Sequence, residues 1–174
     1  MLLGLGADAS AQDQGPSDTS EYLIEAGYIY NFAKLVEWPS SAAVQKSQQI
    51  VIGVLGNEGF ASVLQRVVDG KKIDGRPFLI KRLKSREFKE CGCHILFVSA
   101  AESVRPDDII QFQSAASVLT ISESPDFARR GGIVAFVLED SKVRFAVNVD
   151  AAAQASLTIS SRLLALATIV HTAR

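Results

Sequence analysis

The segment Ile50-Val51-Ile52-Gly53-Val54-Leu55 is an uninterrupted apolar run made largely of β-branched residues. Runs of this kind are typical of strands that are buried on both faces of a parallel sheet. The turn residues Gly56-Asn57-Glu58-Gly59 follow it, and apolar spacing over residues 60–68 then predicts a helix that ends near Gly70. The order of strand, turn and helix predicts an α/β domain.

The same alternation continues on both sides of this segment. Extended patterns predict further strands at residues 77–83, 94–98 and 117–122, and helical spacing predicts helices at 21–38, 106–114, 150–156 and 160–172. Residues 133–138 and 143–149 flank a polar turn, which predicts an antiparallel hairpin at one edge of the sheet. We therefore expect a single α/β domain with a mainly parallel sheet, helices on both of its faces, and this C-terminal hairpin.

Composition excludes several classes of protein. The chain has 174 residues, 18 basic against 19 acidic side chains, and 48% hydrophobic residues. A nucleic-acid-binding domain is usually strongly basic, and a disordered chain has far fewer apolar residues. The longest apolar runs fall short of the roughly 20 residues that span a bilayer, so no transmembrane segment is expected.

The first residues resemble the end of an export signal. A short apolar start is followed by Ala9-Ser10-Ala11, which matches the small-residue pattern at which signal peptides are cleaved. We interpret residues 1–11 as the remnant of a signal peptide, residues 12–20 as a flexible mature N-terminus, and residues 21–174 as the folded domain. The alternative is a frayed cytosolic N-terminus with an accidental Ala-Ser-Ala.

Three segments, in this order, resemble the YfiR-like family. The first is Tyr28-Ile29-Tyr30-Asn31-Phe32-Ala33-Lys34-Leu35-Val36-Glu37-Trp38-Pro39, and the second is Cys93-His94-Ile95-Leu96-Phe97-Val98-Ser99. The third comprises Phe127-Ala128, Gly131-Gly132-Ile133, Val143-Arg144-Phe145, Asn148 and Leu157-Thr158-Ile159-Ser160-Ser161-Arg162-Leu163-Leu164. Together they span about residues 21–170, which is nearly the whole expected mature chain.

The resemblance implies a periplasmic, dimeric and non-enzymatic regulator from a Gram-negative bacterium. Such a protein binds the periplasmic segment of an inner-membrane signalling protein, a diguanylate cyclase, and represses it, which lowers cyclic-di-GMP and biofilm formation. An outer-membrane lipoprotein relieves the repression by sequestering the regulator. No cofactor and no nucleic-acid partner are implied. The alternative is a periplasmic small-molecule binding protein that serves a membrane receptor or a sensor kinase.

Cys91 and Cys93 are the only two cysteines, and they flank Gly92 just before an apolar strand. On that strand His94 would point away from both sulfur atoms, so no metal site is expected. Either the two cysteines form a small disulfide that is easily reduced, or Cys93 is a buried apolar residue and Cys91 a surface thiol. The resemblance matches only Cys93, and implies intramolecular disulfides that influence stability and release of repression.

Residues 71–89 form a strongly basic segment with eight basic and two acidic side chains. The basic residues are Lys71, Lys72, Arg76, Lys81, Arg82, Lys84, Arg86 and Lys89. Such a segment is typical of a solvated face that protects a sheet edge from pairing. It is also suited to docking an acidic partner or membrane headgroups, in which case Lys81, Arg82 and Lys84 are the candidate docking residues.

Arg144, Asn148 and Arg162 are candidates for lining a small ligand pocket. Arg144 and Asn148 lie four residues apart on one strand and so point to the same side. The alternative is that Asn148 caps the helix expected near Asp150, while Arg162 pairs with an acidic residue of the polar turn.

Catalytic chemistry is not predicted. His94 lies within an apolar strand and His171 is close to the end of the chain, and the sequence contains no G-x-S-x-G motif. The turn at residues 56–59 occupies the position where doubly wound folds bind ligands, but it lacks the phosphate-binding motifs, so we interpret it as a simple connection.

Overall fold

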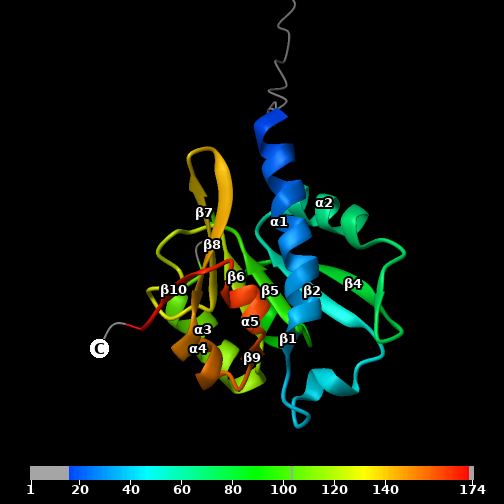
Figure 1. Ribbon diagram of the computed structural model, residues 1–174. Helices are drawn as coiled ribbons and strands as arrows, with labels where there is room; N and C mark the ends of the chain where they lie inside the picture. The colour runs from blue at the N-terminus through cyan, green and yellow to red at the C-terminus, as the bar shows by residue number, and fades with distance from the viewer. Residues whose placement is uncertain (1–15, 103, 173–174) are drawn as a thin grey trace, which may run out of the picture.

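An eight-stranded sheet runs through the computed structural model, which describes residues 16–102 and 104–172 (Figure 1). The strands follow the order β10-β8-β7-β6-β5-β2-β4-β3. Their bounds are β2 (Ile50–Leu55), β3 (Lys72–Ile73), β4 (Arg76–Leu83), β5 (Ile95–Val98), β6 (Leu119–Ser122), β7 (Val134–Glu139), β8 (Lys142–Asn148) and β10 (Thr168–Val170). A separate two-stranded sheet joins β1 (Val36–Glu37) to β9 (Thr158–Ile159).

The central strands β4, β2, β5, β6 and β7 are parallel to one another. The hairpin of β7 and β8 is antiparallel, as is the pair of β3 and β4. Along the chain, the direction in which strands are added reverses next to β2, so β2 and β5 flank a topological switch point. In open α/β sheets the crevice outside the carboxyl ends of such strands is the usual place for a ligand.

Helices cover both faces of the sheet, and each face has its own apolar core. Their bounds are α1 (Pro16–Leu35), α2 (Glu58–Val68), α3 (Pro106–Ala116), α4 (Val149–Gln154) and α5 (Ser161–Leu164), with 3-10 helices η1 (Ala43–Lys46) and η2 (Ser85–Glu90). Alternate residues of β5 divide between the cores: Ile95 and Phe97 pack with α1 and α2, whereas Leu96 and Val98 pack with η2 and α3. The predicted fold class is therefore confirmed.

The first helix differs from its predicted range at both ends. It begins at Pro16 instead of residue 21, so residues 16–20, expected to be flexible, are helical. Proline suits a first helical turn, and Asp18 in that turn interacts favourably with the helix dipole. The helix ends at Leu35, because Val36 and Glu37 leave it to pair with β9. Residues 1–11, interpreted as a leader, lie outside the described residues.

The prediction of a long helix over residues 160–172 was wrong. Only α5 is helical there, and the β-branched residues Thr168, Ile169 and Val170 form β10. This strand pairs in parallel with β8, so it takes the edge position and the hairpin lies one strand further in. The apolar spacing suited either structure, and the neighbouring strand decided between them.

Beyond the sheet, the N-terminal half of α1 projects next to the hairpin of β7 and β8 (Figure 1). Within the described residues, no helix combines the length and the apolarity that a membrane crossing requires.

Candidate functional site

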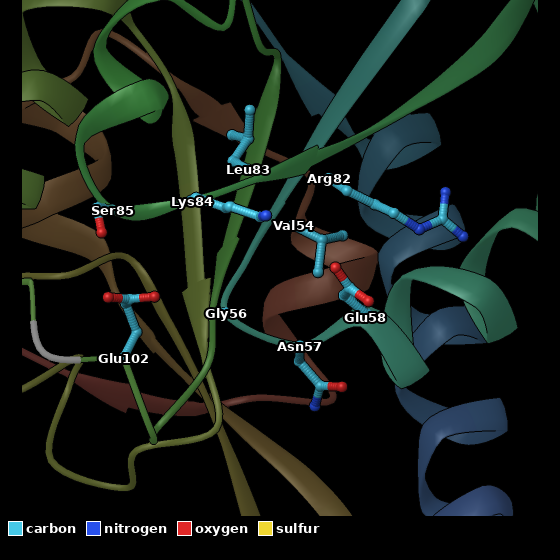
Figure 2. A pocket seen from close by; sticks show the side chains of 9 residues that line it. All are labelled: Val54, Gly56, Asn57, Glu58, Arg82, Leu83, Lys84, Ser85 and Glu102. Atoms are coloured by element: carbon cyan, nitrogen blue, oxygen red, sulfur yellow. The ribbon is translucent and has the colours of Figure 1, made fainter.

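A cavity of about 400 Å³ lies at the carboxyl ends of β2 and β4, beside the topological switch point (Figure 2). Each wall comes from a different part of the chain: the β2 strand with the turn before α2, the end of β4, and the loop after β5. The lining residues are Val54, Gly56, Asn57, Glu58, Arg82, Leu83, Lys84, Ser85 and Glu102. We call this the switch-point cavity. Its volume falls within the range of small-molecule sites, which is roughly 300–1,000 Å³.

The turn that forms one wall of the switch-point cavity is held by Asn57. The side-chain oxygen of Asn57 accepts a hydrogen bond from the Phe60 amide at 2.8 Å and so caps α2. Its amide nitrogen donates to the Tyr22 hydroxyl of α1 at 2.9 Å. Gly56 has φ +84°, and a Cβ there would lie 2.8 Å from the Glu102 carboxylate. The turn is thus hydrogen-bonded to α1 and α2, and it lies close to the loop after β5.

The charges around the switch-point cavity are of both signs. Arg82 and Lys84 are exposed on one side, where the Arg82 guanidinium donates to the Ser62 hydroxyl at 3.1 Å. Glu58 contributes a carboxylate from the start of α2, and Glu102 contributes one from the loop after β5 (Figure 2). A ligand with both a cationic and an anionic group would match this lining better than a simple anion.

The structure separates Lys81 from the other two predicted docking residues. Lys81 is half-buried, and its ammonium group donates to the Cys91 carbonyl at 2.7 Å. Arg82 and Lys84 instead line the switch-point cavity. The basic segment thus presents two of its three candidate residues together, and uses the third to hold the loop before β5.

Cys91 and Cys93 are joined by a disulfide, and both residues are buried. The interpretation of Cys91 as a surface thiol is therefore wrong. Gly53 in β2 makes room for this bridge, because a Cβ at that position would lie 2.8 Å from the Cys93 sulfur. A redox role for the bridge stays a prediction.

The three candidate pocket residues do not share one cavity. Asn148 is fully buried; it caps α4 by accepting from the Ala151 amide at 2.9 Å, and it donates to the Ala128 carbonyl at 2.7 Å. The capping part of the predicted alternative is therefore confirmed, whereas its second part is not: Glu139 of the polar turn pairs with Arg144 and not with Arg162. Arg144 forms an exposed ion pair with Glu139 at 3.4 Å and lines a cavity that includes neither Asn148 nor Arg162. Arg162 is exposed on α5.

His94 is held as part of the core. It is fully buried, its Nδ1 accepts from the Val51 amide at 3.1 Å, and its carbonyl accepts from the Trp38 indole at 3.2 Å. Burial, with a smaller contribution from the charge of Arg76, lowers the pKa of His94 to about 4. The imidazole is therefore neutral at physiological pH and serves as a hydrogen-bond acceptor between two strands.

A second cavity, which the sequence did not predict, lies between α1 and the hairpin of β7 and β8. Its volume is about 170 Å³, and three carboxylates converge on it, those of Glu21, Glu25 and Glu123. The remaining lining residues are Tyr22, Phe136, Val137, Leu138 and Val143. We call this cavity the acidic groove.

Glu25 is the unusual member of the acidic groove, because only 7% of it is exposed. Desolvation, and secondarily the charges of Glu123 and Glu21, raise the pKa of Glu25 to about 8. Burial likewise raises the pKa of Glu123, although the Ala100 amide donates to that carboxylate. Spacing could have revealed Glu25, since it lies four residues before the buried Ile29 on the inward face of α1.

Comparison with known proteins gives a family and a fold. The family model described as YfiR/HmsC-like matches residues 22–168. A search among curated proteins returned no match. Among solved structures, the fold is similar to that of a conserved domain protein from Vibrio cholerae O1 biovar El Tor, with a TM-score of 0.58 and 13% sequence identity. That alignment covers 83% of this chain but only 59% of the Vibrio chain, which is thus considerably longer than the shared fold.

The family match extends over almost all of the described domain. It includes α1 from Tyr22 onward, the central sheet up to the first residue of β10, the whole switch-point cavity, and every lining residue of the acidic groove except Glu21. The resemblance noted in three separate segments of the sequence is thereby confirmed over a continuous stretch. This chain belongs to the YfiR/HmsC-like family.

Proposed function

We propose that the protein is a non-enzymatic periplasmic regulator that binds and represses a membrane signalling protein, a diguanylate cyclase. The observation that carries this proposal is the family match over residues 22–168, which spans almost all of the α/β domain. Repression would lower cyclic-di-GMP and, with it, biofilm formation. In this scheme the chain acts as a homodimer, and an outer-membrane lipoprotein relieves repression by sequestering it.

The chemistry of the described residues supports a binding role over a catalytic one. His94 is buried and engaged with the backbone of β2. His171 is exposed and pairs with Asp150 at 3.2 Å. Neither histidine lines the switch-point cavity or the acidic groove, so neither is placed to transfer a proton to a ligand in those cavities.

Arg82 and Lys84 are the basic residues that this proposal assigns to partner docking. They are exposed on the same wall of the switch-point cavity, where an acidic surface could approach them. Lys81 is left out of this surface because its ammonium group is bound to the Cys91 carbonyl.

Deleting the gene tests the proposed function directly. Loss of a repressor should raise cellular cyclic-di-GMP several-fold, and a plasmid copy of the wild-type gene should restore the original level. The measurement is nucleotide quantification by mass spectrometry, together with a biofilm assay. Unchanged cyclic-di-GMP in the deletion strain would contradict repression of a cyclase.

The switch-point cavity favours a second candidate, a small-molecule binding protein that serves a membrane receptor or sensor kinase. Its support is the cavity's volume of about 400 Å³ at the usual ligand position of a doubly wound sheet. Under this alternative, a ligand screen by thermal shift should find a stabilising small molecule. Substituting both Arg82 and Lys84 by Ala should abolish that stabilisation.

A further inference from the structure

The acidic groove contains a carboxyl oxygen without a hydrogen-bond partner. Glu25 Oε2 is buried and has no hydrogen-bond partner among the described residues. A buried polar atom without a partner destabilises the fold, by about 1–3 kcal/mol for a neutral group and more for a charged one. Packing therefore does not explain a glutamate at position 25, since an apolar residue on the inward face of α1 would pack better.

The surroundings of Glu25 carry negative charge only. Glu21 lies one turn before it on α1, and Glu123 reaches the groove from the loop after β6. The Tyr22 hydroxyl, the remaining titratable group of the lining, accepts from Asn57. No lysine or arginine is among the residues that line the groove. Three carboxyl groups without a cation favour a positively charged group that comes from outside the domain.

The size and walls of the groove indicate the form of that cation. A volume of about 170 Å³ is smaller than the roughly 300–1,000 Å³ of typical small-molecule sites, and suits one long side chain. Phe136, Val137 and Val143 provide the apolar part of the lining. Arginine and lysine have this combination of an apolar stem and a cationic end. Leu138 at the rim is 56% exposed, so an incoming segment would also bury apolar surface there.

We propose that the acidic groove is a docking pocket for one arginine or lysine side chain of a protein partner. The guanidinium or ammonium group donates to Glu25 and Glu123, and the apolar stem packs between α1 and the hairpin of β7 and β8. This proposal rests on the proposed function, because a regulator that binds a membrane protein supplies the partner. It adds to that function a second docking surface, separate from Arg82 and Lys84. This surface prefers a basic group of the partner, whereas Arg82 and Lys84 prefer an acidic one.

Binding at this pocket is linked to protonation of Glu25. Burial and the neighbouring carboxylates of Glu21 and Glu123 raise the pKa of Glu25 to about 8, so the empty pocket holds a proton at neutral pH. A cation favours the carboxylate form, and docking therefore releases that proton. Affinity for the basic side chain should rise as the pH increases from 6 to 8.5.

The test uses Nα-acetyl-arginine amide as a probe that carries one guanidinium group and no other charge. It is titrated into the full chain at pH 8.5 while backbone amide resonances are followed by NMR. The expected result is saturable shifts at residues of the acidic groove. The neutral isostere Nα-acetyl-citrulline amide should produce none of these shifts. Equal shifts with the citrulline probe, or no saturable shifts with the arginine probe, would overturn the proposal.

Three variants locate the binding within the groove. Glu25→Gln and Glu123→Gln should each lower the affinity for the arginine probe at least tenfold, because each removes an anionic acceptor while keeping the side-chain shape. Glu37→Gln is the matched control: Glu37 is exposed in β1, at the opposite end of α1. If Glu25→Gln perturbs the fold, the affinity of the Glu123→Gln variant alone tests the proposal. Retention of full affinity by a folded Glu123→Gln variant would contradict the assignment.

Complementation of the deletion strain separates this proposal from the proposed function. If the wild-type gene restores low cyclic-di-GMP and the Glu25→Gln, Glu123→Gln double variant does not, the groove serves partner docking. If the double variant restores repression as well as the wild type, the docking pocket is wrong while the regulatory function stands. If deletion leaves cyclic-di-GMP unchanged, the regulatory function fails, and with it the assignment of the groove to that partner.

Discussion

The switch-point cavity and the acidic groove lie on either side of the contact between Tyr22 and Asn57. Their charged groups differ in exposure and in the sign of the neighbouring charges. In the switch-point cavity, Arg82 and Lys84 are exposed, and carboxylates from other walls accompany them. In the acidic groove, one carboxyl group is buried and has only like charges near it. Exposed charges contribute little to stability, whereas a buried unpaired carboxyl contributes a large unfavourable term. The two regions should therefore respond very differently to pH and to substitution.

The largest expected effect is the pH dependence caused by Glu25. The folded state keeps this proton up to about pH 8, while the unfolded chain releases it near the ordinary glutamate pKa of 4.5. The folded state thus binds more protons within this window, and the free energy of unfolding falls as the pH rises from about 4.5 to 8. The loss should be on the order of 3–5 kcal/mol. Urea denaturation at a series of pH values measures it.

Glu25→Gln provides the control for this pH effect. The amide cannot ionise, so the variant should approach the wild type in stability near pH 4.5 and exceed it increasingly toward pH 8.5. Glu37→Gln should follow the wild-type curve throughout, because Glu37 is exposed. Parallel curves for wild type and Glu25→Gln would refute the burial of an ionisable carboxyl at this position.

An intermediate effect is expected where the two regions meet. Asn57→Ala removes the cap of α2 and the hydrogen bond to the Tyr22 hydroxyl. Loss of the cap destabilises the fold by about 1 kcal/mol, and loss of the second bond adds roughly 0.5–1.5 kcal/mol. Chemical denaturation at pH 7 measures the sum.

Asn57→Asp serves as the matched control for the cap. Aspartate can cap α2, and its second oxygen can accept from the Tyr22 hydroxyl in place of the donated bond, so this variant should recover the capping part of the loss and part or all of the rest. If Asn57→Asp were as unstable as Asn57→Ala, the cap would not account for the loss of stability.

The smallest effect on stability is expected in the switch-point cavity. Reversing Arg82 and Lys84 to Glu should change the free energy of unfolding by less than about 0.5 kcal/mol, since both side chains are exposed. The same double variant should fail to restore repression in the deletion strain if these residues dock the partner. Normal repression by a stable double variant would remove them from the docking surface.

Much of the fold was predictable because β-branched runs and turn residues agree with the tertiary structure. Residues 50–55 were predicted to form a strand and do so as β2, and the helix expected at 60–68 forms as α2. The end of the chain was not predictable in the same way. Residues 168–170 fit either an apolar helix or a strand, and the pairing with Ala146, Val147 and Asn148 is a long-range contact that no local pattern encodes.

The site was less predictable than the fold. The sequence singled out Arg82 and Lys84 by charge density, but it could not tell that Lys81 would be bound to a carbonyl ten residues away. Glu25 was overlooked because a carboxylate in an amphipathic helix is normally assigned to the solvated face. The spacing before Ile29 places Glu25 on the inward face of α1, but the groove that it lines is formed with β7 and β8, from residues more than one hundred positions later.

The small sheet formed by β1 and β9 has a consequence for the order of folding. Val36 directly follows α1, yet its partner Ile159 is among the last residues of the domain to be synthesised. Contacts between such distant residues carry a large loop-closure entropy and are expected to form late. The C-terminal end of α1 is therefore secured later than its contact with α2, which Tyr22 and Asn57 make between residues only 35 positions apart. Until Ile159 pairs with Val36, that end of the helix is accessible to chaperones, to a second chain, or to proteolysis.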